Sequence, residues 1–228
     1  MYYRLTPETT PPHLQFLWQA PEPPQELYIA GQRSAFEMLR QLPLHGLAVV
    51  GARDHTGRCE KLMDTVIKKL KDSPLVIVSG LARGIDTLAH LTAIKYGIPS
   101  IGISGVGIDT HYTDEYQALK NNLIGSGGLV ITEYGPKVVT KPMHFLMRNR
   151  LIASYTQATW VVEAKKRSGA LNTARWAREE GRTCYATPCH PDDTDFAGNR
   201  ILIERDQALP LWSTSDLGSV WLDLAARK

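Results

Sequence analysis

Short apolar runs recur along this chain, and several of them end at a glycine. Continuous apolar runs are typical of strands that are covered on both faces, as in parallel sheets. Helix-like segments of roughly 10–15 residues separate the runs, which favours βαβ units and a parallel sheet. The predicted strands are residues 47–51, 75–80, 98–103, 129–133, 159–164 and 182–186. The sequence therefore predicts an α/β fold with a Rossmann-like, doubly wound, mostly parallel sheet and helices on both faces.

The first part of the chain differs in composition from the rest. Residues 1–26 contain two proline-rich stretches, and Pro-Pro pairs favour extended chain over helix. We expect a proline-rich N-terminal arm over residues 1–26, either packed along the domain or partly mobile, and one Rossmann-like domain over residues 27–228. Within that domain, residues 27–31 are expected to form a short strand, and Ser34 is expected to cap a helix that reaches about Leu42.

The bulk composition excludes several classes of protein. No run of about 18 apolar residues is present, so a membrane-spanning helix is not expected, and the first residues lack the apolar segment of a secretory signal. The three cysteines form neither a C-x-x-C motif nor an even disulfide set, which is typical of reduced cytoplasmic thiols. Cys189-His190 has no second pair at ligand spacing, so no metal site is expected. The net charge of +3 is compatible with nucleic acid but does not indicate it.

The predicted strand ends carry the polar residues of interest, because ligands of open parallel sheets bind beyond the carboxyl ends of the strands. Arg53 and Arg83 follow neighbouring strands and would make this edge positive. Glycines at positions 51, 80 and 84 leave backbone amides accessible to a phosphate. Neither G-x-G-x-x-G nor G-x-x-x-x-G-K-[ST] occurs, so ordinary dinucleotide or nucleoside triphosphate chemistry, and a bound cofactor, are not expected.

An unusual stretch follows a long polar loop, where Phe145 precedes Arg148, Asn149 and Arg150. Apolar residues at helical spacing after Arg148 predict that a helix begins there. Arginines in a first turn face the positive end of the helix dipole, which is tolerated when an anion lies between them and the free amides. The alternatives that these arginines pair with carboxylates inside the fold, and that Phe145 is a core aromatic, remain open.

Together these segments resemble the DprA/Smf family of DNA-processing proteins. The matching segments follow one another in family order over roughly residues 27–217, and they are residues 49–53, 79–90, 105–112, 145–150, 168–174 and 181–182. The chain departs from the family in three ways. It is too short for the helical domain and the winged-helix domain that flank the Rossmann part in many members. Leu146 stands where the family has proline, and Cys189-His190 follows Pro188 where the family has glycine.

The resemblance implies a cytoplasmic, non-enzymatic homodimer that binds single-stranded DNA and loads a RecA-type recombinase onto it during natural transformation. Single-strand binding needs a positive groove and an aromatic face on which bases stack, and Phe145 beside Lys141 and two arginines supplies both. The candidate DNA-binding residues are Arg53, Ser79, Gly80, Arg83, Gly84, Lys141, Phe145, Arg148, Asn149, Arg150, Ser168 and Gly169. The apolar tail, with Trp212 and residues 220–224, is the candidate dimer patch.

Two other functions stay open on the sequence. A nucleotide-processing relative of the lysine-decarboxylase-like phosphoribohydrolases would carry Pro-Gly-Gly-x-Gly-Thr-x-x-Glu, whereas residues 165–173 have no acid at the corresponding position. A nucleotide-sensing module of a larger assembly is the other alternative. Asp86 and His90 lie four residues apart on one predicted helix and are expected to share a helix-face hydrogen bond rather than to form a catalytic pair. Glu163 ends a predicted strand, and both a pairing with an arginine of the site and a purely structural role stay open for it.

Overall fold

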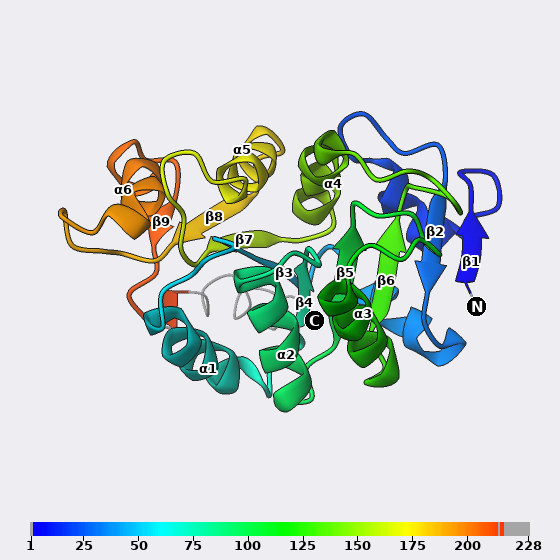
Figure 1. Ribbon diagram of the computed structural model, residues 1–228, viewed down its shortest axis with the longest axis horizontal. Coiled ribbons are helices and arrows are strands. Elements are labelled where there is room, and N and C mark those ends of the chain that lie inside the picture. The colour runs from blue at the N-terminus through cyan, green and yellow to red at the C-terminus, as the bar shows by residue number, and fades with distance from the viewer. Residues whose placement is uncertain (1, 214, 217–228) are drawn as a thin grey trace.

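A single sheet organises the computed structural model, which describes residues 2–213 and 215–216. The strands of these residues are ordered β1-β2-β6-β5-β4-β3-β7-β8-β9 (Figure 1). Their bounds are Tyr2–Leu5 (β1), Leu27–Ala30 (β2), Gly46–Val50 (β3), Val76–Ser79 (β4), Ser100–Ser104 (β5), Leu129–Thr132 (β6), Ala158–Val161 (β7), Thr183–Ala186 (β8) and Leu209–Pro210 (β9). The strands from β6 to β9 in this order pair in parallel, whereas β2 and β1 add an antiparallel edge. The α/β, mostly parallel prediction is confirmed.

Helices cover both faces of the sheet (Figure 1). One face carries α1 (Arg58–Leu70), α2 (Ile85–Lys95) and α3 (Asp114–Gly125), and the other carries α4 (Pro142–Ser154), α5 (Ala170–Glu179) and α6 (Ala197–Glu204). Three 3₁₀ segments complete the described elements: η1 (Pro12–Trp18), η2 (Arg33–Gln41) and η3 (Thr194–Phe196). Because the strands are buried on both faces, each side of the sheet has its own apolar core.

The N-terminal segment packs against the same face as α4. Leu14 and Leu17 of η1 are buried in the core that also contains residues of α4. The Tyr155 hydroxyl at the end of α4 donates a hydrogen bond to the Leu17 carbonyl over 2.9 Å. Before this 3₁₀ segment, β1 pairs with β2 and closes one edge of the sheet. The N-terminal segment therefore contributes apolar side chains to the core beside α4.

Two predicted helices begin or fold differently in the structure. The segment expected to be a helix capped by Ser34 is the 3₁₀ segment η2, whose preceding residue is Gln32. Helix α4 begins at Pro142, so Arg148 lies in the middle of the helix and not in its first turn. Proline is favoured at the first helical position, where its missing N–H costs nothing. The prediction that a helix begins at Arg148, with the arginines at the positive end of its dipole, is therefore wrong.

The order of the strands creates a switch point. From β3 the chain moves outward through β4, β5 and β6, and then returns through α4 to place β7 on the other side of β3. The loops that follow β3 and β7 consequently leave the same edge of the sheet in opposite directions. In doubly wound sheets a crevice for ligands opens at this point.

Candidate functional site

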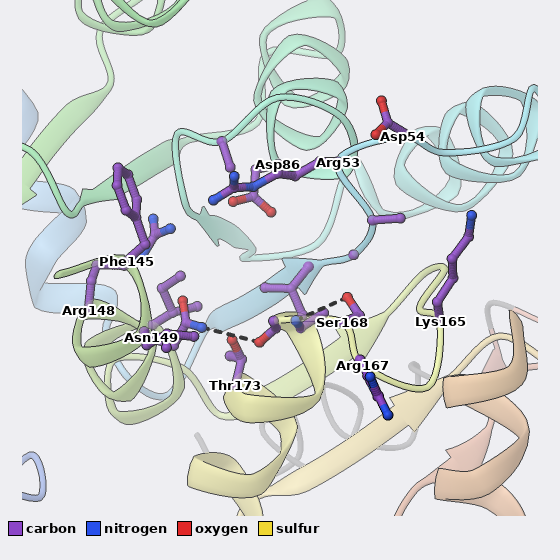
Figure 2. A pocket seen from close by; sticks show the side chains of 18 residues that line it. Arg53, Asp54, Asp86, Phe145, Arg148, Asn149, Lys165, Arg167, Ser168 and Thr173 are labelled. Carbon is purple, nitrogen blue, oxygen red and sulfur yellow. Dashed lines mark hydrogen bonds between the residues drawn. The ribbon is translucent and has the colours of Figure 1, made fainter. Parts of the chain in front are cut away.

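A pocket of about 520 Å³ lies at the switch point. Its walls come from the loop after β3, the start of α2, the middle of α4 and the loop that leads into α5 (Figure 2). Six of the candidate residues line it, namely Arg53, Phe145, Arg148, Asn149, Ser168 and Gly169. Residues far apart in the sequence therefore meet here because three loops and one crossover helix converge on the same sheet edge.

Phe145 and Arg53 form one wall of the pocket. The Arg53 guanidinium carbon lies 5.8 Å from the centroid of the Phe145 ring, within the range of a cation–π contact. Arg53 is exposed and Phe145 is half-buried. The ring packs over Gly105, where a Cβ would lie 3.1 Å from Phe145 Cδ1. Phe145 is thus half-buried, and it presents an aromatic surface beside the exposed cationic side chain of Arg53.

Two buried side chains of opposite charge form the floor. Arg148 is 4% exposed and Asp86 is 7% exposed, and both line the pocket. Burial raises the pKa of the Asp86 carboxyl, and the positive charge of Arg148 counteracts part of this rise. The Arg148 guanidinium donates to the Ile103 carbonyl, while its Nε has no partner among the described residues. A Cβ at Gly80 would overlap both charged groups, so glycine is required where β4 ends.

Arg150 has a structural role. Its two terminal nitrogens donate to the two carboxylate oxygens of Glu133, each over 2.7 Å. Its Nε donates to the carbonyls of Pro21 and Glu22. Arg150 is 3% exposed and does not line the pocket. For this arginine the alternative of a carboxylate partner inside the fold is correct.

The loop before α5 forms the opposite wall (Figure 2). The Asn149 amide of α4 donates to the Gly169 carbonyl over 3.2 Å, which joins the two walls. The Ser168 hydroxyl accepts from the Ala170 amide over 3.3 Å at the start of α5. Free amides at a helix N-terminus favour an anion. Lys165 and Arg167 are exposed and also line this wall. Neither residue was predicted to belong to the site. The sequence signal that could have identified them is the basic run that directly follows the buried strand.

The other candidate residues lie behind or beside the pocket. Ser79 is buried, and its hydroxyl donates to the Val49 carbonyl over 2.6 Å. Gly84 has a φ of +88°, and a Cβ there would overlap the carbonyl oxygens of the loop that carries Arg53. Arg83 is exposed and pairs with Asp54 at 2.6 Å. Lys141 is exposed directly before α4.

For Glu163 the structural role is correct, whereas the expected hydrogen bond between Asp86 and His90 is wrong. Glu163 takes no arginine: its carboxylate accepts from the Thr56 amide and hydroxyl and from the Cys59 thiol, and so holds the start of α1. His90 does not bond Asp86. Its Nε2 bonds the Gly80 carbonyl over 2.6 Å, and its Nδ1 bonds the Ser100 hydroxyl over 2.8 Å. Burial lowers the pKa of His90 to about 4, so the ring is neutral at pH 7 and supports the loop after β4.

The pocket can thus hold an anion and a planar ring at the same time. Cationic groups and helix amides supply the anion site, and Phe145 supplies the face for the ring. Within residues 2–213 and 215–216, no group of three or more acidic, histidine or cysteine side chains is arranged to hold a metal ion. None of the helices described is long and apolar enough to cross a membrane.

Comparison with known proteins gives a consistent result. A family model described as DNA recombination-mediator protein A matches residues 6–221. The protein Smf of Synechocystis is 34% identical over 218 residues, which are 95% of this chain and 53% of the relative. The structure of DNA processing protein A from Streptococcus pneumoniae aligns with a TM-score of 0.82 at 34% identity, covering 96% of this chain and 74% of that one.

A second solved structure is similar to this chain over almost its whole length. DNA processing protein A from Helicobacter pylori, described for its single-stranded DNA binding mode, aligns with a TM-score of 0.80 at 26% identity, covering 98% of this chain and 96% of that one. The chain spans about half of the length of the curated relatives from Streptococcus pneumoniae and Synechocystis.

Proposed function

This chain belongs to the DNA recombination-mediator protein A family, and from that premise we propose that it binds single-stranded DNA in the pocket at the switch point. The observation that carries the proposal is the contact between Arg53 and Phe145, 5.8 Å apart on one wall. Single strands are held by cationic groups along the phosphates and by aromatic faces on which bases stack. Here both kinds of group meet on one wall, above the buried Arg148.

The opposite wall supplies the second support. Ser168, Gly169 and the first amides of α5 offer hydrogen-bond donors to a phosphate, and Lys165 and Arg167 add positive charge at the rim. No helix-turn-helix arrangement projects toward the pocket in the described residues, so there is no element to enter a major groove. We therefore propose a preference for single strands over duplex with little sequence selectivity.

Membership of the family supports a proposal for the role of the bound strand. We propose that the protein acts as a non-catalytic mediator in the cytoplasm, loads a RecA-type recombinase onto the strand during natural transformation, and works as a homodimer. The absence of a catalytic step is supported by the surroundings of Asp86 and His90. The carboxylate faces Arg148 and the imidazole is neutral and hydrogen-bonded, so neither is poised to move a proton to a substrate.

A competition experiment tests the binding proposal. A labelled single-stranded oligonucleotide is bound to the protein at two salt concentrations and then displaced with unlabelled single strand or blunt duplex. We expect the single strand to compete much more strongly, and we expect affinity to fall with salt because counterions are released from the phosphates. Equal competition by the duplex would contradict the proposal. Binding or turnover of free nucleotides without binding of the oligonucleotide would favour a nucleotide-sensing or nucleotide-processing function instead.

A further inference from the structure

A second hollow of about 600 Å³ lies next to the first pocket and has no role in the function described so far. Its walls are the loop between β5 and α3 and the loop between β6 and α4. Its volume is in the range of ligand sites, roughly 300–1,000 Å³. The first of these loops contains the Gly105-Val106-Gly107 turn and Tyr112.

Tyr112 joins the two hollows. It lines the second one, and its ring centroid lies 5.6 Å from that of Phe145, which lines the first. The buried Tyr116 supports Tyr112 from behind in an edge-to-face contact at 6.0 Å. Tyr112 nevertheless remains 47% exposed. An aromatic ring that is fixed by two others and still open to solvent is suited to stacking on a planar ligand.

The walls of the second hollow are held together by hydrogen bonds. The Ile108 amide donates to the Tyr134 carbonyl over 3.0 Å, and the Lys137 amide donates to the Asp109 carboxylate over 3.0 Å. A Cβ at Gly107 would lie 2.8 Å from the Gly135 carbonyl, so the glycine permits the close approach of the two loops. The hollow is therefore a preformed feature of the fold.

Lys137 gives the second hollow its cation. Its φ of +61° is unusual for a residue other than glycine, and such strain persists where the surrounding structure imposes it, often at binding sites. The Asp109 carboxylate binds its backbone amide, and the side chain is exposed with no ion pair among the residues described. Val139 nearby is 74% exposed, so the hollow combines an apolar surface, an aromatic ring and a cation.

We propose that this hollow is a second nucleotide subsite of the same strand, in which Tyr112 stacks on a base and Lys137 contacts a phosphate. The inference rests on the proposed single-strand binding, and it extends the bound strand from the switch point past Phe145 to the loops above β5 and β6. Tyr112 lines the second hollow and is not among the residues that line the first pocket. The contribution of Tyr112 should consequently appear only when the oligonucleotide is long enough to enter both hollows.

Oligothymidylates of increasing length, from the dinucleotide upward, provide the test. Tyr112→Ala should leave the affinity for the dinucleotide unchanged and should weaken the longer oligomers roughly fivefold to a hundredfold, the range for loss of one stacked base. Tyr112→Phe keeps the stacking face and should bind every length as the parent does. Tyr2→Ala removes a similarly exposed tyrosine from the edge strand β1 and should change nothing. Lys137→Gln should reduce the salt dependence of the longer oligomers by about 0.7 in the slope of log K against log salt.

The outcomes separate this inference from the function on which it rests. If Tyr112→Ala binds all lengths like the parent while Arg53→Ala binds them less well, the second subsite is absent and single-strand binding stands. If Tyr112→Ala weakens the dinucleotide as much as the longer oligomers, Tyr112 belongs to the first pocket and the second subsite is again excluded. If the parent binds no oligonucleotide of any length, single-strand binding itself fails.

Discussion

At the scale of single residues, the proposed mode of binding combines two contacts that respond differently to salt. Stacking on Phe145 depends little on ionic strength, whereas a phosphate contact from Arg53 acts through counterion release. The two side chains are neighbours on one wall, so variants of each can be compared on the same strand. The difference between the salt slopes of the two variants shows which side chain contacts a phosphate and which stacks on a base.

We expect Phe145→Ala to weaken single-strand binding roughly fivefold to a hundredfold, since stacking is worth roughly 1–3 kcal/mol per base, and to leave the salt slope unchanged. Arg53→Ala should reduce the slope by about 0.7 and should matter more at low salt. Fluorescence titration at several salt concentrations measures both. Arg33→Ala is a control, because Arg33 is exposed after the antiparallel strand β2, at the opposite edge of the sheet. Parent-like binding by both folded pocket variants would place the DNA elsewhere.

Arg150 should matter for folding rather than for contact with DNA. Arg150→Met leaves the Glu133 carboxylate without its bidentate partner, and breaking a buried pair costs about 3–5 kcal/mol. Urea denaturation measures the loss in the free energy of unfolding. The matched control is Arg40→Met, whose partner Glu37 is exposed and whose loss should cost less than about 1 kcal/mol. A comparable effect of the two substitutions would show that the Arg150 pair is not a buried structural element.

The two arginines also show what the sequence could and could not predict. Arg148 and Arg150 are two residues apart in one motif, and both were expected to contact DNA. The structure places Arg148 on the pocket floor and Arg150 against Glu133 and the carbonyls of Pro21 and Glu22. These partners lie directly after β6 and in the N-terminal segment. Their approach depends on the tertiary packing of α4, which no local pattern encodes.

At the scale of elements, the parallel strands and most helices could be predicted because apolar runs and glycine stops are local signals. The start of α4 was missed because the apolar residues after Arg148 outweighed Pro142 as a signal for the helix start. Strand β1 and helix α6 were missed too: β1 has only four half-exposed or exposed residues, and α6 follows a polar loop without a strong start signal. Edge elements are specified by their neighbours more than by their own sequence.

The start of α2 offers a test at this scale. Gly84→Ala should strain a residue with φ of +88° and push against the carbonyls of the loop that carries Arg53. We expect a loss of stability greater than the roughly 1–2 kcal/mol of the left-handed backbone alone, together with weaker DNA binding. Gly84 combines its positive φ with a ψ of −129°, close to a region that is essentially restricted to glycine. Gly97→Ala is the control for a positive φ without a steric contact, because Gly97 has φ of +68° and open space around its Cβ. Equal destabilisation by the two variants, with DNA binding intact, would show that the contact between these loops is unimportant.

At the scale of the whole molecule, we expect a homodimer. The exposed Trp212 follows β9 at 77% exposure and belongs to the apolar tail of the sequence, while residues 220–224 of that tail lie outside the described residues. Light scattering at micromolar concentration should give the mass of two chains, and Trp212→Ala should shift it toward one. Leu44→Ala, at another exposed apolar position, should leave it unchanged. A monomer mass for the parent would contradict the expectation.

The contacts of α4 with the N-terminal segment have a consequence for cooperativity. Tyr155 and Arg150 of α4 hydrogen-bond the carbonyls of Leu17, Pro21 and Glu22, so this segment and the helix that carries Phe145 form one unit of local opening. In hydrogen exchange, the amides of η1 and α4 should lose protection together. If the strand binds as proposed, changes in residues 14–22 should therefore alter DNA affinity from outside the pocket, by changing how often α4 is in place.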